Sequence, residues 1–374
     1  MSTILIACGG TGGHLAPGIA LAEVFVKEGH RCLLLVSQKT VDSALIRKYE
    51  SLDFIAIPGQ GFSGGIWQGL SALWSLYRSL RVVLRLIRQE SPDLVFLLGG
   101  FLSAGPGLAA RLGGIPVVLH EANSAPGRVT RWLAPLAERV YLPAGLSLEN
   151  VASEKLRHPG YPVRQEIAAI PIACARASLR LDLETKLLVV IGGSQGARAL
   201  NDWAEENFES LAESGISIFC VSGLQQAEAQ KTTLQNRAGK LCSFTRVEFT
   251  DQMATVLSAA DLVVSRAGAG SIAELAACRR PAVLIPYPYA ADDHQTANAL
   301  ALEATGGGHM LAQSQLGLLA VKVKNLIFDI EALKQMQGAL EKIDPTNTAK
   351  DIAQDLLTLT RARQTSKTKS GNET

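Results

Sequence analysis

The sequence predicts an α/β protein with two parallel-sheet, Rossmann-like domains, and three observations favour this fold. Short apolar segments alternate with helical stretches over most of the 374 residues, as is typical of parallel sheets covered by helices. The chain is 47% hydrophobic and 19% charged, and its length suffices for two cores. The two halves also echo each other, because an Asp-Leu-Val segment, a Gly-rich loop, a helix and a Pro-led strand follow in order from Asp93 and again from Asp261.

Nine segments are predicted as strands because they are short, rich in Val, Ile and Leu, and separated by turn residues or helical stretches. In chain order they are Ile4–Ala7, Arg31–Val36, Phe54–Ile57, Leu94–Leu98, Val117–Leu119, Leu187–Ile191, Ser217–Val221, Leu262–Ser265 and Ala282–Ile285. The turn-rich segment from Pro159 to Val163 predicts the domain boundary. We expect domains at 1–163 and 164–340, a C-terminal helix at 341–358 packing back on the first domain, and a disordered tail at 359–374.

Three Gly-rich segments each follow a predicted strand and open a helix. They are Gly9-Gly10-Thr11-Gly12-Gly13-His14, Gly192-Gly193-Ser194-Gln195-Gly196-Ala197 and Arg266-Ala-Gly-Ala-Gly-Ser271. Glycine lets backbone N–H groups approach an anion, and a helix N-terminus attracts negative charge. Cradles of this kind in both halves indicate two diphosphates and group transfer between phosphorylated partners. The alternative for each segment is a tight turn without a ligand.

A dinucleotide-binding fold is the competing interpretation of the first Gly-rich loop. The G-x-G-x-x-G spacing from Gly10 requires Gly or Ala at position 15, where Leu15 stands. The strand ending at Val36 is followed by Ser37 rather than by an acidic residue for a ribose. The spacing therefore argues against this fold.

Two polar segments of the second half suit a sugar nucleotide. Glu274 lies one turn into the third Gly-loop helix, where a carboxylate can accept both hydrogen bonds of a ribose diol. The alternative is a Glu favoured only by the helix dipole. The polar run from Asp292 to Asn298 follows the strand ending at Ile285. Strand C-terminal ends are where α/β folds bind ligands, so these groups can bind sugar hydroxyls.

Composition excludes several classes of partner. Lys plus Arg number 36 against 34 Asp plus Glu, a net charge of +2, so nucleic acid is not expected. The six cysteines are scattered singly and the six histidines do not cluster, which predicts a reducing compartment and no metal. We expect no signal peptide. The longest uncharged run, from Leu94 to Ala110, is interrupted by glycines, so we expect a strand, a loop and a short helix there and not a helix that spans a membrane.

The segment after Gly65 predicts an amphipathic helix. Its expected apolar stripe contains Ile66, Leu70, Leu73, Tyr77, Leu80, Leu84 and Ile87, and its flank carries Trp67, Trp74, Arg78, Arg81, Arg85 and Arg88. Arg and Trp along one edge are typical of helices that bind an anionic membrane surface. The alternative is a helix that packs its stripe on the sheet and leaves its arginines in solvent.

As an ordered set, these segments resemble the MurG family of peripheral GT-B glycosyltransferases. The resemblance covers roughly residues 3 to 358 and includes the three Gly-rich loops, His120-Glu121-Ala122-Asn123, Pro162-Val163-Arg164, Phe249-Thr250-Asp251 and His294-Gln295 with Asn298. The chain departs from the family pattern at three positions, with Ala122 for the usual Gln, Tyr161 for Asn and Ala267 for Ser. These departures flank the expected contacts and bear on affinity more than on reaction type.

The resemblance implies two domains facing across a cleft and transfer of GlcNAc from UDP-GlcNAc to undecaprenyl-diphospho-MurNAc-pentapeptide (lipid I). The product would be the β-1,4-linked lipid II of peptidoglycan synthesis, formed with inversion. No cofactor or metal is implied, because helix N-termini and Arg164 can take up the leaving-group charge. The implied location is peripheral, on the cytoplasmic face of the cell membrane, with division or elongation proteins as further partners. The alternatives are a related GT-B enzyme for another lipid acceptor and a non-catalytic sugar-nucleotide-binding subunit.

The resemblance also implies roles for single residues. Thr11, Gly12 and Gly13 would border the sugar and diphosphates, Asn123 would reach the GlcNAc, Arg164 and Ser194 would face the UDP diphosphate, Thr250 would present backbone to the uracil, and Gln295 would bind sugar hydroxyls. The turn formed by Ala269, Gly270, Ser271, Ile272, Ala273 and Glu274 would hold phosphate and ribose.

His14 is the leading catalytic candidate. It stands at the start of the first helix, and an ordinary imidazole pKa near 6.5 suits a general base. The alternative is that His14 donates to the acceptor diphosphate or caps the loop. Glu121 is a second candidate, either to orient or deprotonate the acceptor or as a structural hydrogen-bond acceptor.

Overall fold

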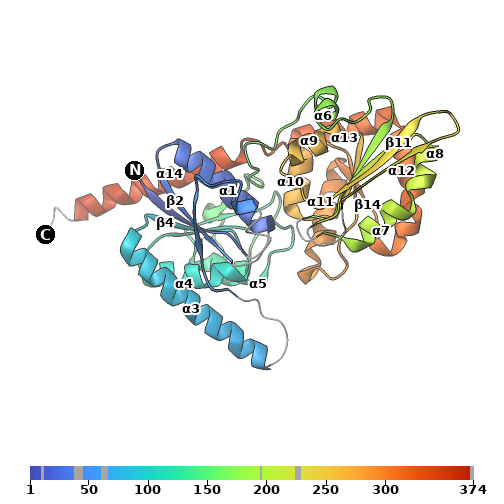
Figure 1. Ribbon diagram of the computed structural model, residues 1–374. Coiled ribbons are helices and arrows are strands. Elements are labelled where there is room, and N and C mark those ends of the chain that lie inside the picture. Colours follow the sequence, from blue (N-terminus) through green and yellow to red (C-terminus); the bar gives the residue numbers. More distant parts are fainter. Residues whose placement is uncertain (10–11, 38–44, 60–65, 194–195, 224–228, 371–374) are drawn as a thin grey trace. The chain divides into compact units, whose positions relative to one another are not determined.

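The computed structural model describes residues 1–9, 12–37, 45–59, 66–193, 196–223 and 229–370. Its contacts divide the chain into two compact units (Figure 1). Unit 1 comprises Met1–Ala122, Pro126–Gln165 and Asn347–Thr374, and unit 2 comprises Asn123–Ala125 and Glu166–Thr346. The chain therefore leaves unit 1 after Gln165 and returns to it after Thr346.

Unit 1 is built on a seven-stranded parallel sheet in the order β3-β2-β1-β4-β5-β6-β7. Its strands are β1 (Thr3–Ala7), β2 (Arg31–Val36), β3 (Asp53–Ala56), β4 (Leu94–Leu97), β5 (Val117–His120), β6 (Arg139–Tyr141) and β7 (Leu156–Arg157). Its helices are α1 (Gly12–Lys27), α3 (Ile66–Glu90), α4 (Ala104–Leu112), α5 (Arg128–Leu133) and α14 (Thr348–Ser370), with short η1 (Phe101–Ser103), η2 (Ala134–Leu136) and η3 (Ser153–Lys155). The strands β6 and β7 have only three and two residues, too few for periodicity to reveal.

Both faces of this sheet are covered, as the continuous apolar strands require. Figure 1 shows α1 and α14 on one face and α3, α4 and α5 on the other. Because side chains alternate along β1, Ile4 and Ile6 pack with α1 and α14, whereas Leu5 joins the cluster under α3 and α4.

The C-terminal helix differs from the predicted tail. The helix α14 contacts α1 and contributes Ile352 and Leu356 to the core. It runs on to Ser370, although the sequence predicts disorder from residue 359. Its last turns contain no Gly or Pro, and Arg, Gln and Lys are favourable helix residues.

Unit 2 has a second seven-stranded sheet, in the order β10-β11-β9-β8-β12-β13-β14. Its strands are β8 (Lys186–Ile191), β9 (Ile216–Val221), β10 (Gln230–Gln235), β11 (Leu241–Val247), β12 (Leu262–Ser265), β13 (Ala282–Leu284) and β14 (Gly308–Met310). The helices are α6 (Ile172–Ser178), α7 (Arg198–Glu206), α8 (Phe208–Glu213), α9 (Met253–Ala259), α10 (Ala269–Ala277), α11 (His294–Thr305), α12 (Leu319–Ile327) and α13 (Ile330–Lys342), with η4 (Ala291–Asp293) and η5 (Gln313–Leu318). The pairing is parallel except for the β10–β11 hairpin at one edge.

These two sheets confirm the predicted fold class. The nine predicted strands all form, within a residue or two of the expected bounds. The sequence did not reveal β10, β11 and β14. The strand β10 is mostly exposed and polar, so it lacks the apolar pattern by which a strand is recognised.

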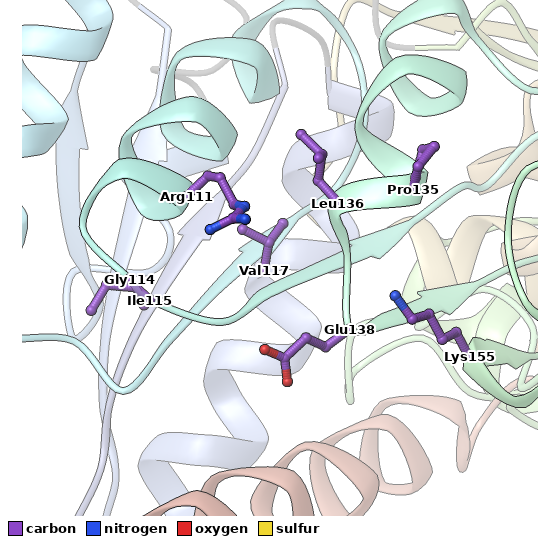
Figure 2. Close-up of a pocket in the computed structure, with 8 residues that line it drawn as sticks. All are labelled: Arg111, Gly114, Ile115, Val117, Pro135, Leu136, Glu138 and Lys155. Carbon is purple, nitrogen blue, oxygen red and sulfur yellow. The ribbon is translucent and has the colours of Figure 1, made fainter.

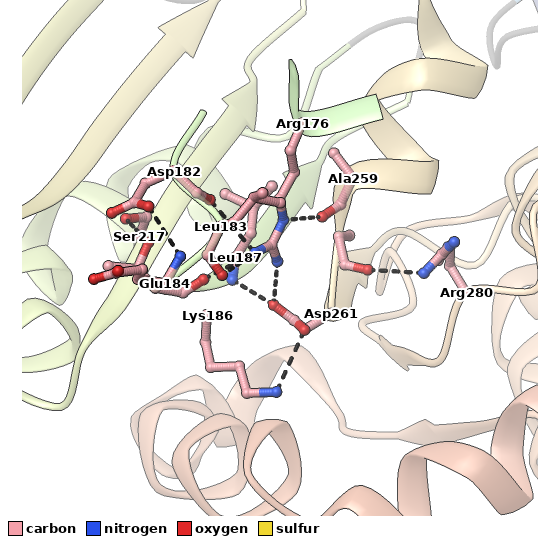
Figure 3. A network of polar contacts seen from close by, with 12 residues as sticks. Arg176, Asp182, Leu183, Glu184, Lys186, Leu187, Ser217, Ala259, Asp261 and Arg280 are labelled. Atoms are coloured by element: carbon pink, nitrogen blue, oxygen red, sulfur yellow. Dashed lines mark hydrogen bonds and ion pairs between the residues drawn. The ribbon is translucent and has the colours of Figure 1, made fainter. Parts of the chain in front are cut away.

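A buried ion pair fixes the first segment of unit 2 to its sheet (Figure 3). The guanidinium of Arg176 donates to Asp261 Oδ2 at 2.5 Å and to the carbonyls of Ala259 and Thr185 at 3.0 Å. The same carboxylate accepts the backbone N–H of Leu187 at 2.7 Å. The start of β8 is thereby joined to the start of β12 and to α6.

The helix α3 packs the carboxyl-terminal part of the predicted stripe on unit 1, where Ile87 is buried and Leu80 and Leu84 contact the core, but its amino-terminal half differs from the prediction. Leu70, Leu73, Trp74 and Tyr77 are 46–60% exposed, whereas Ala72, Ser79, Val83, Leu86 and Ile87 are buried. The buried side includes the smaller residues because α4 approaches closely, and a Cβ on Gly105 would lie 2.3 Å from Ser79 Oγ. Among the described residues, no helix is long and apolar enough to span a bilayer.

Candidate functional site

The predicted residues of unit 1 gather at the carboxyl edge of its sheet. The chain after β1 leads to β2 on one side, whereas β4 lies on the other side of β1. This change of direction is a topological switch point, where α/β folds bind ligands. His14 begins α1 directly beside it, and the turns after β4 and β5 adjoin it.

Glycines form the walls around the half-buried imidazole of His14. A Cβ on Gly9 would lie 2.6 Å from His14 Cγ, and a Cβ on Gly100 would lie 3.3 Å from Cε1. Gly99 and Gly100 also adopt left-handed backbone, with φ of 80° and 69°, which other residues rarely tolerate. The Ser103 hydroxyl donates to the Gly99 carbonyl at 2.6 Å. The imidazole is therefore held between the turns after β1 and β4.

Sequence reasoning missed the Gly99-Gly100 turn as part of this site. A Gly-Gly pair directly after a predicted strand was the available signal. It could not be joined to His14 because the order of strands in the sheet is not visible in the sequence.

Glu121 has a structural role at the end of β5. Its Oε2 accepts the Thr130 hydroxyl at 2.6 Å and the Gly127 N–H at 3.2 Å, and the side chain is only 5% exposed. These bonds hold the loop that leads to α5. Of the two roles considered for Glu121, the geometry supports that of a structural hydrogen-bond acceptor.

His120 is buried beside this site. Its Nε2 lies 3.1 Å from the Gly160 carbonyl. Burial lowers the pKa of His120 from its ordinary value, and the Gly160 carbonyl and Glu121 oppose this effect in part. Burial thus favours the neutral imidazole, in which Nε2–H donates to the Gly160 carbonyl.

Arg164 belongs to unit 1, whereas Thr250 and the predicted 269–274 turn belong to unit 2. Arg164 is 8% exposed, and its Nη1 lies 3.5 Å from the Tyr49 hydroxyl. The neighbouring Gln165 N–H contacts Glu23 Oε2 at 3.4 Å. The segment that the sequence assigns to the domain boundary is thus attached along its length to unit 1.

The predicted residues of unit 2 also gather at a switch point, where β9 and β12 flank β8 on opposite sides. The Gly192-Gly193 turn follows β8, Thr250 follows β11, the predicted 269–274 turn opens α10 after β12, and Gln295 opens α11 after β13. Each of these strands ends at the same edge, because β8, β9, β11, β12 and β13 run parallel. The structure thus brings these candidates to one edge, with Glu274 half-buried on α10.

Two residues that lie in the predicted site segments, but to which sequence reasoning assigned no individual role, organise its loops. Arg266 donates to the carbonyls of Ile285 and Pro286, each at 3.1 Å, and its Nη2 donates to Gln313 Oε1 at 2.6 Å. Asn298 Nδ2 donates to the Ala267 carbonyl at 3.1 Å. Both are buried polar side chains next to strand ends, and their partners lie far along the chain.

Asn123 is grouped with unit 2 by its contacts. Its Oδ1 accepts from Asn298 Nδ2 at 3.2 Å, and the next backbone N–H, of Ser124, donates to Asn298 Oδ1 at 2.8 Å. Asn298 therefore connects the predicted GlcNAc contact to the loop before α10. Gln295 Oε1 accepts the Tyr287 N–H at 2.9 Å.

Thr11 and Ser194 lie outside the described residues. Within the described ranges, no group of three or more His, Cys, Asp or Glu side chains is arranged to hold a metal ion.

A cavity of about 390 Å³ lies elsewhere in unit 1 (Figure 2). Arg111, Glu138 and Lys155 line it from three separate elements, together with Leu136 and the start of β5. It adjoins the amino ends of β5, β6 and β7 and contains none of the predicted site residues. Each candidate site, in contrast, lies at the carboxyl ends of the strands of its own sheet.

Comparison with known proteins gives this geometry a family. The family model of the glycosyltransferase family 28 N-terminal domain matches residues 4–142, and that of the glycosyltransferase family 28 C-terminal domain matches residues 187–356. An Opitutus terrae protein is 46% identical over 96% of both chains, and a Hydrogenovibrio crunogenus protein is 34% identical over 96% of this chain and 98% of its own. Both are named UDP-N-acetylglucosamine--N-acetylmuramyl-(pentapeptide) pyrophosphoryl-undecaprenol N-acetylglucosamine transferase.

Solved structures agree with this assignment. The crystal structure of MurG from Acinetobacter baumannii matches with a TM-score of 0.70 at 26% identity, covering 96% of this chain and 99% of that chain. A kitacinnamycin glycosyltransferase matches with a TM-score of 0.71 at 17% identity, over 96% and 99% of the two chains, which shows a shared fold alone. With both domains matched in order and a relative of equal extent, the chain belongs to glycosyltransferase family 28, in its MurG group of GT-B enzymes.

Proposed function

We propose that the chain transfers GlcNAc from UDP-GlcNAc to lipid I with inversion, forming the β-1,4 linkage of lipid II. The observation that carries the proposal is the 46% identity, over 96% of both chains, to a transferase whose name states these substrates. The two switch-point sites fit this reaction, because each sheet offers Gly-rich turns and a helix N-terminus to a diphosphate.

In this proposal unit 2 binds the donor. The N-terminus of α10, from Ala269, faces the UDP phosphates, and Glu274 accepts the hydrogen bonds of the ribose diol. Thr250 presents backbone to the uracil. The Gln295 carbonyl oxygen is engaged by Tyr287 N–H, so its NH₂ group is the part that binds a sugar hydroxyl. The helix N-terminus and the Gly-rich turns of unit 2 bind the donor phosphates, and Arg164 of unit 1 remains the proposed cation for the UDP diphosphate.

Unit 1 binds the acceptor at the turns that surround His14. The acceptor hydroxyl oxygen attacks C1 of GlcNAc, its proton passes to the His14 imidazole, and the bond from C1 to the UDP oxygen breaks. Attack from the face opposite UDP inverts the anomeric centre. A half-buried imidazole with its ring fixed by Gly9 and Gly100 suits a general base. The alternative role, donation to the acceptor diphosphate, uses the same position.

A lipid-linked acceptor requires a surface that meets the membrane, and we assign this role to the amino-terminal half of α3. Its patch is defined by the exposed side chains of Leu70, Leu73, Trp74 and Tyr77. Trp74 stacks on Tyr77 with ring centroids 5.5 Å apart. The exposed Arg78, Arg81, Arg85 and Arg88 follow along the helix, as expected for a helix at an anionic interface. We place the protein on the cytoplasmic face of the membrane, where its lipid-linked acceptor would be met. Division or elongation proteins are further proposed partners.

The test is a transfer assay with the purified full chain and radiolabelled UDP-GlcNAc. Lipid I should become labelled, whereas diacylglycerol, the acceptor of related GT-B enzymes, should not. His14→Ala should lower kcat by about a hundredfold or more if the imidazole is the base. If His14 only binds the acceptor diphosphate, the KM for lipid I should rise while kcat at saturation stays close to that of the parent. Label on diacylglycerol, or no label on lipid I, would overturn the assignment.

A further inference from the structure

The carbonyl of Gly13 has no helical partner of the usual kind. In a regular α-helix the N–H of residue 17 donates to the carbonyl of residue 13. Residue 17 of α1 is Pro17, which has no N–H. Instead, the Tyr161 hydroxyl donates to the Gly13 carbonyl at 2.8 Å, from a segment 148 residues away. A distant side chain therefore replaces the hydrogen bond that Pro17 removes.

Tyr161 is itself held firmly in unit 1. Its side chain is 8% exposed, and its ring meets the His120 ring edge-on, with centroids 6.2 Å apart. On the preceding residues, the Gly160 carbonyl accepts from His120 Nε2 at 3.1 Å and the Pro159 carbonyl accepts the Thr348 hydroxyl at 2.9 Å. The hydroxyl is thus placed by contacts to β5 and α14.

The carbonyl that Tyr161 holds is next to His14. The imidazole of His14 has little freedom, because a Cβ on Gly9 would clash with its Cγ at 2.6 Å and a Cβ on Gly100 would press on its Cε1 at 3.3 Å. A shift of the Gly13 peptide would therefore move the imidazole against these walls. It would also redirect the first N–H groups of α1, which form the anion-binding end of the helix.

We propose that Tyr161 is a positioning residue for His14, acting through the carbonyl of Gly13 that Pro17 leaves without its helical donor. The kinetic consequence rests on the proposed transfer reaction, in which His14 acts on the acceptor. The structural consequence does not rest on that reaction.

The first test is Tyr161→Phe, which removes only the hydroxyl. Loss of one hydrogen bond should lower kcat about three- to tenfold, with the KM for UDP-GlcNAc unchanged because the proposed uracil, ribose and sugar contacts of the donor are in unit 2. Tyr141→Phe is the matched control, since the Tyr141 hydroxyl also donates within unit 1, to Asp355 Oδ2 at 2.7 Å. It should cost stability and leave kcat unchanged. Equal kcat in Tyr161→Phe and parent, or equal kcat losses in both variants, would overturn the proposal.

The second test restores the missing donor. In Pro17→Ala/Tyr161→Phe the residue 17 N–H can bond to the Gly13 carbonyl. The double variant should regain most of the kcat lost in Tyr161→Phe, a coupling that independent structural defects would not show. Additive losses in the double variant would contradict the proposal.

The third test does not depend on activity. In protein labelled at histidine, the ring resonances of His14 are assigned by comparison with His14→Gln. Tyr161→Phe should shift them, and Tyr141→Phe should not. Unchanged His14 resonances in Tyr161→Phe would overturn the positioning role. Failure of the parent protein to transfer GlcNAc would overturn the proposed function alone, and the resonance test would still decide the role of Tyr161.

Discussion

At the scale of single residues, the site depends on small side chains and positive φ angles more than on charged groups. The Gly-rich loop and His14 could be predicted from the sequence, because a strand, several glycines and a helical pattern follow one another directly. The opposite wall, formed by Gly99 and Gly100, could not be predicted, because it follows β4, a strand distant in sequence. The same limit hid Tyr161, whose hydrogen-bond partner Gly13 belongs to the first helix.

Gly100→Ala tests how tightly His14 is held. The new Cβ would lie 3.3 Å from His14 Cε1 and would occupy a backbone with φ of 69°. We expect kcat to fall about tenfold or more, because small displacements of a reacting group are costly. Gly114→Ala is the matched control, since its φ is 67° and no atom lies within 4 Å of the new Cβ. Because Gly100 combines its positive φ with a ψ of 174°, a region that essentially only glycine adopts, Gly100→Ala should lose more stability than Gly114→Ala, and kcat is compared under conditions where both variants are folded. Equal kcat in both variants would mean that His14 is not confined by Gly100.

At the scale of elements, the sequence predicted the existence of a helix more reliably than the side of the helix that is buried. The apolar residues of α3 occur on more than one side, so periodicity alone selected a stripe that is partly exposed. The close approach of Ser79 to Gly105 decided the buried side, and helix–helix distance is a tertiary property. The exposed residues are, as a result, those that form the proposed membrane patch.

Replacing Arg78, Arg81, Arg85 and Arg88 by Gln tests this patch. Each arginine contributes about 1 kcal/mol at an anionic surface, so binding to anionic vesicles should weaken strongly, and added salt should mimic the effect. A control with Lys231, Arg237, Lys240 and Lys334 changed to Gln removes the same charge from unit 2 and should bind vesicles like the parent. Turnover of a long-chain lipid acceptor should fall more than that of a short soluble analogue. Equal losses for both acceptors would make α3 a structural helix only.

In unit 2, the ion pair of Arg176 and Asp261 joins α6 to the starts of β8 and β12. The Arg176 and Asp261 side chains are 4% and 14% exposed. Arg176→Met leaves the largely buried Asp261 carboxylate with the longer Lys186 Nζ contact, at 3.4 Å, in place of the guanidinium, which should lower the free energy of unfolding by about 3 kcal/mol. Arg279→Met removes the half-exposed pair with Glu341 and should cost less than about 1 kcal/mol. Denaturant unfolding measures both, and similar costs would refute the anchoring role of Arg176.

At the scale of the whole molecule, the division into two units was predictable because each half carries its own strand, Gly-rich loop and helix series. The exact crossing points were not, because Pro159 to Gln165 looks like a linker in sequence but is hydrogen-bonded to unit 1. The assignment of Asn123 to unit 2 likewise depends on Asn298, far along the chain.

The donor should stabilise one unit selectively. At about 100 times its Kd, UDP-GlcNAc should stabilise unit 2 by about 2.7 kcal/mol, and calorimetry should show the shift in the transition of that unit. Glu274→Ala should reduce the shift, since hydrogen bonds to a charged group contribute about 1.5–3 kcal/mol. Glu209→Gln, an exposed change on α8, should not. A shift of the parent's full size in Glu274→Ala, at the same donor concentration, would remove this carboxylate from the donor site.

The structure of the product tests the central claim most directly. Lipid I and UDP-GlcNAc are incubated with the full chain, and the isolated lipid product is examined by NMR for the position and anomeric configuration of the new linkage. The proposed reaction predicts a single GlcNAc joined β-1,4 to the MurNAc residue, because attack opposite UDP inverts the α-linked donor. An α-linked product, GlcNAc joined at another position, or free GlcNAc released by water would contradict it.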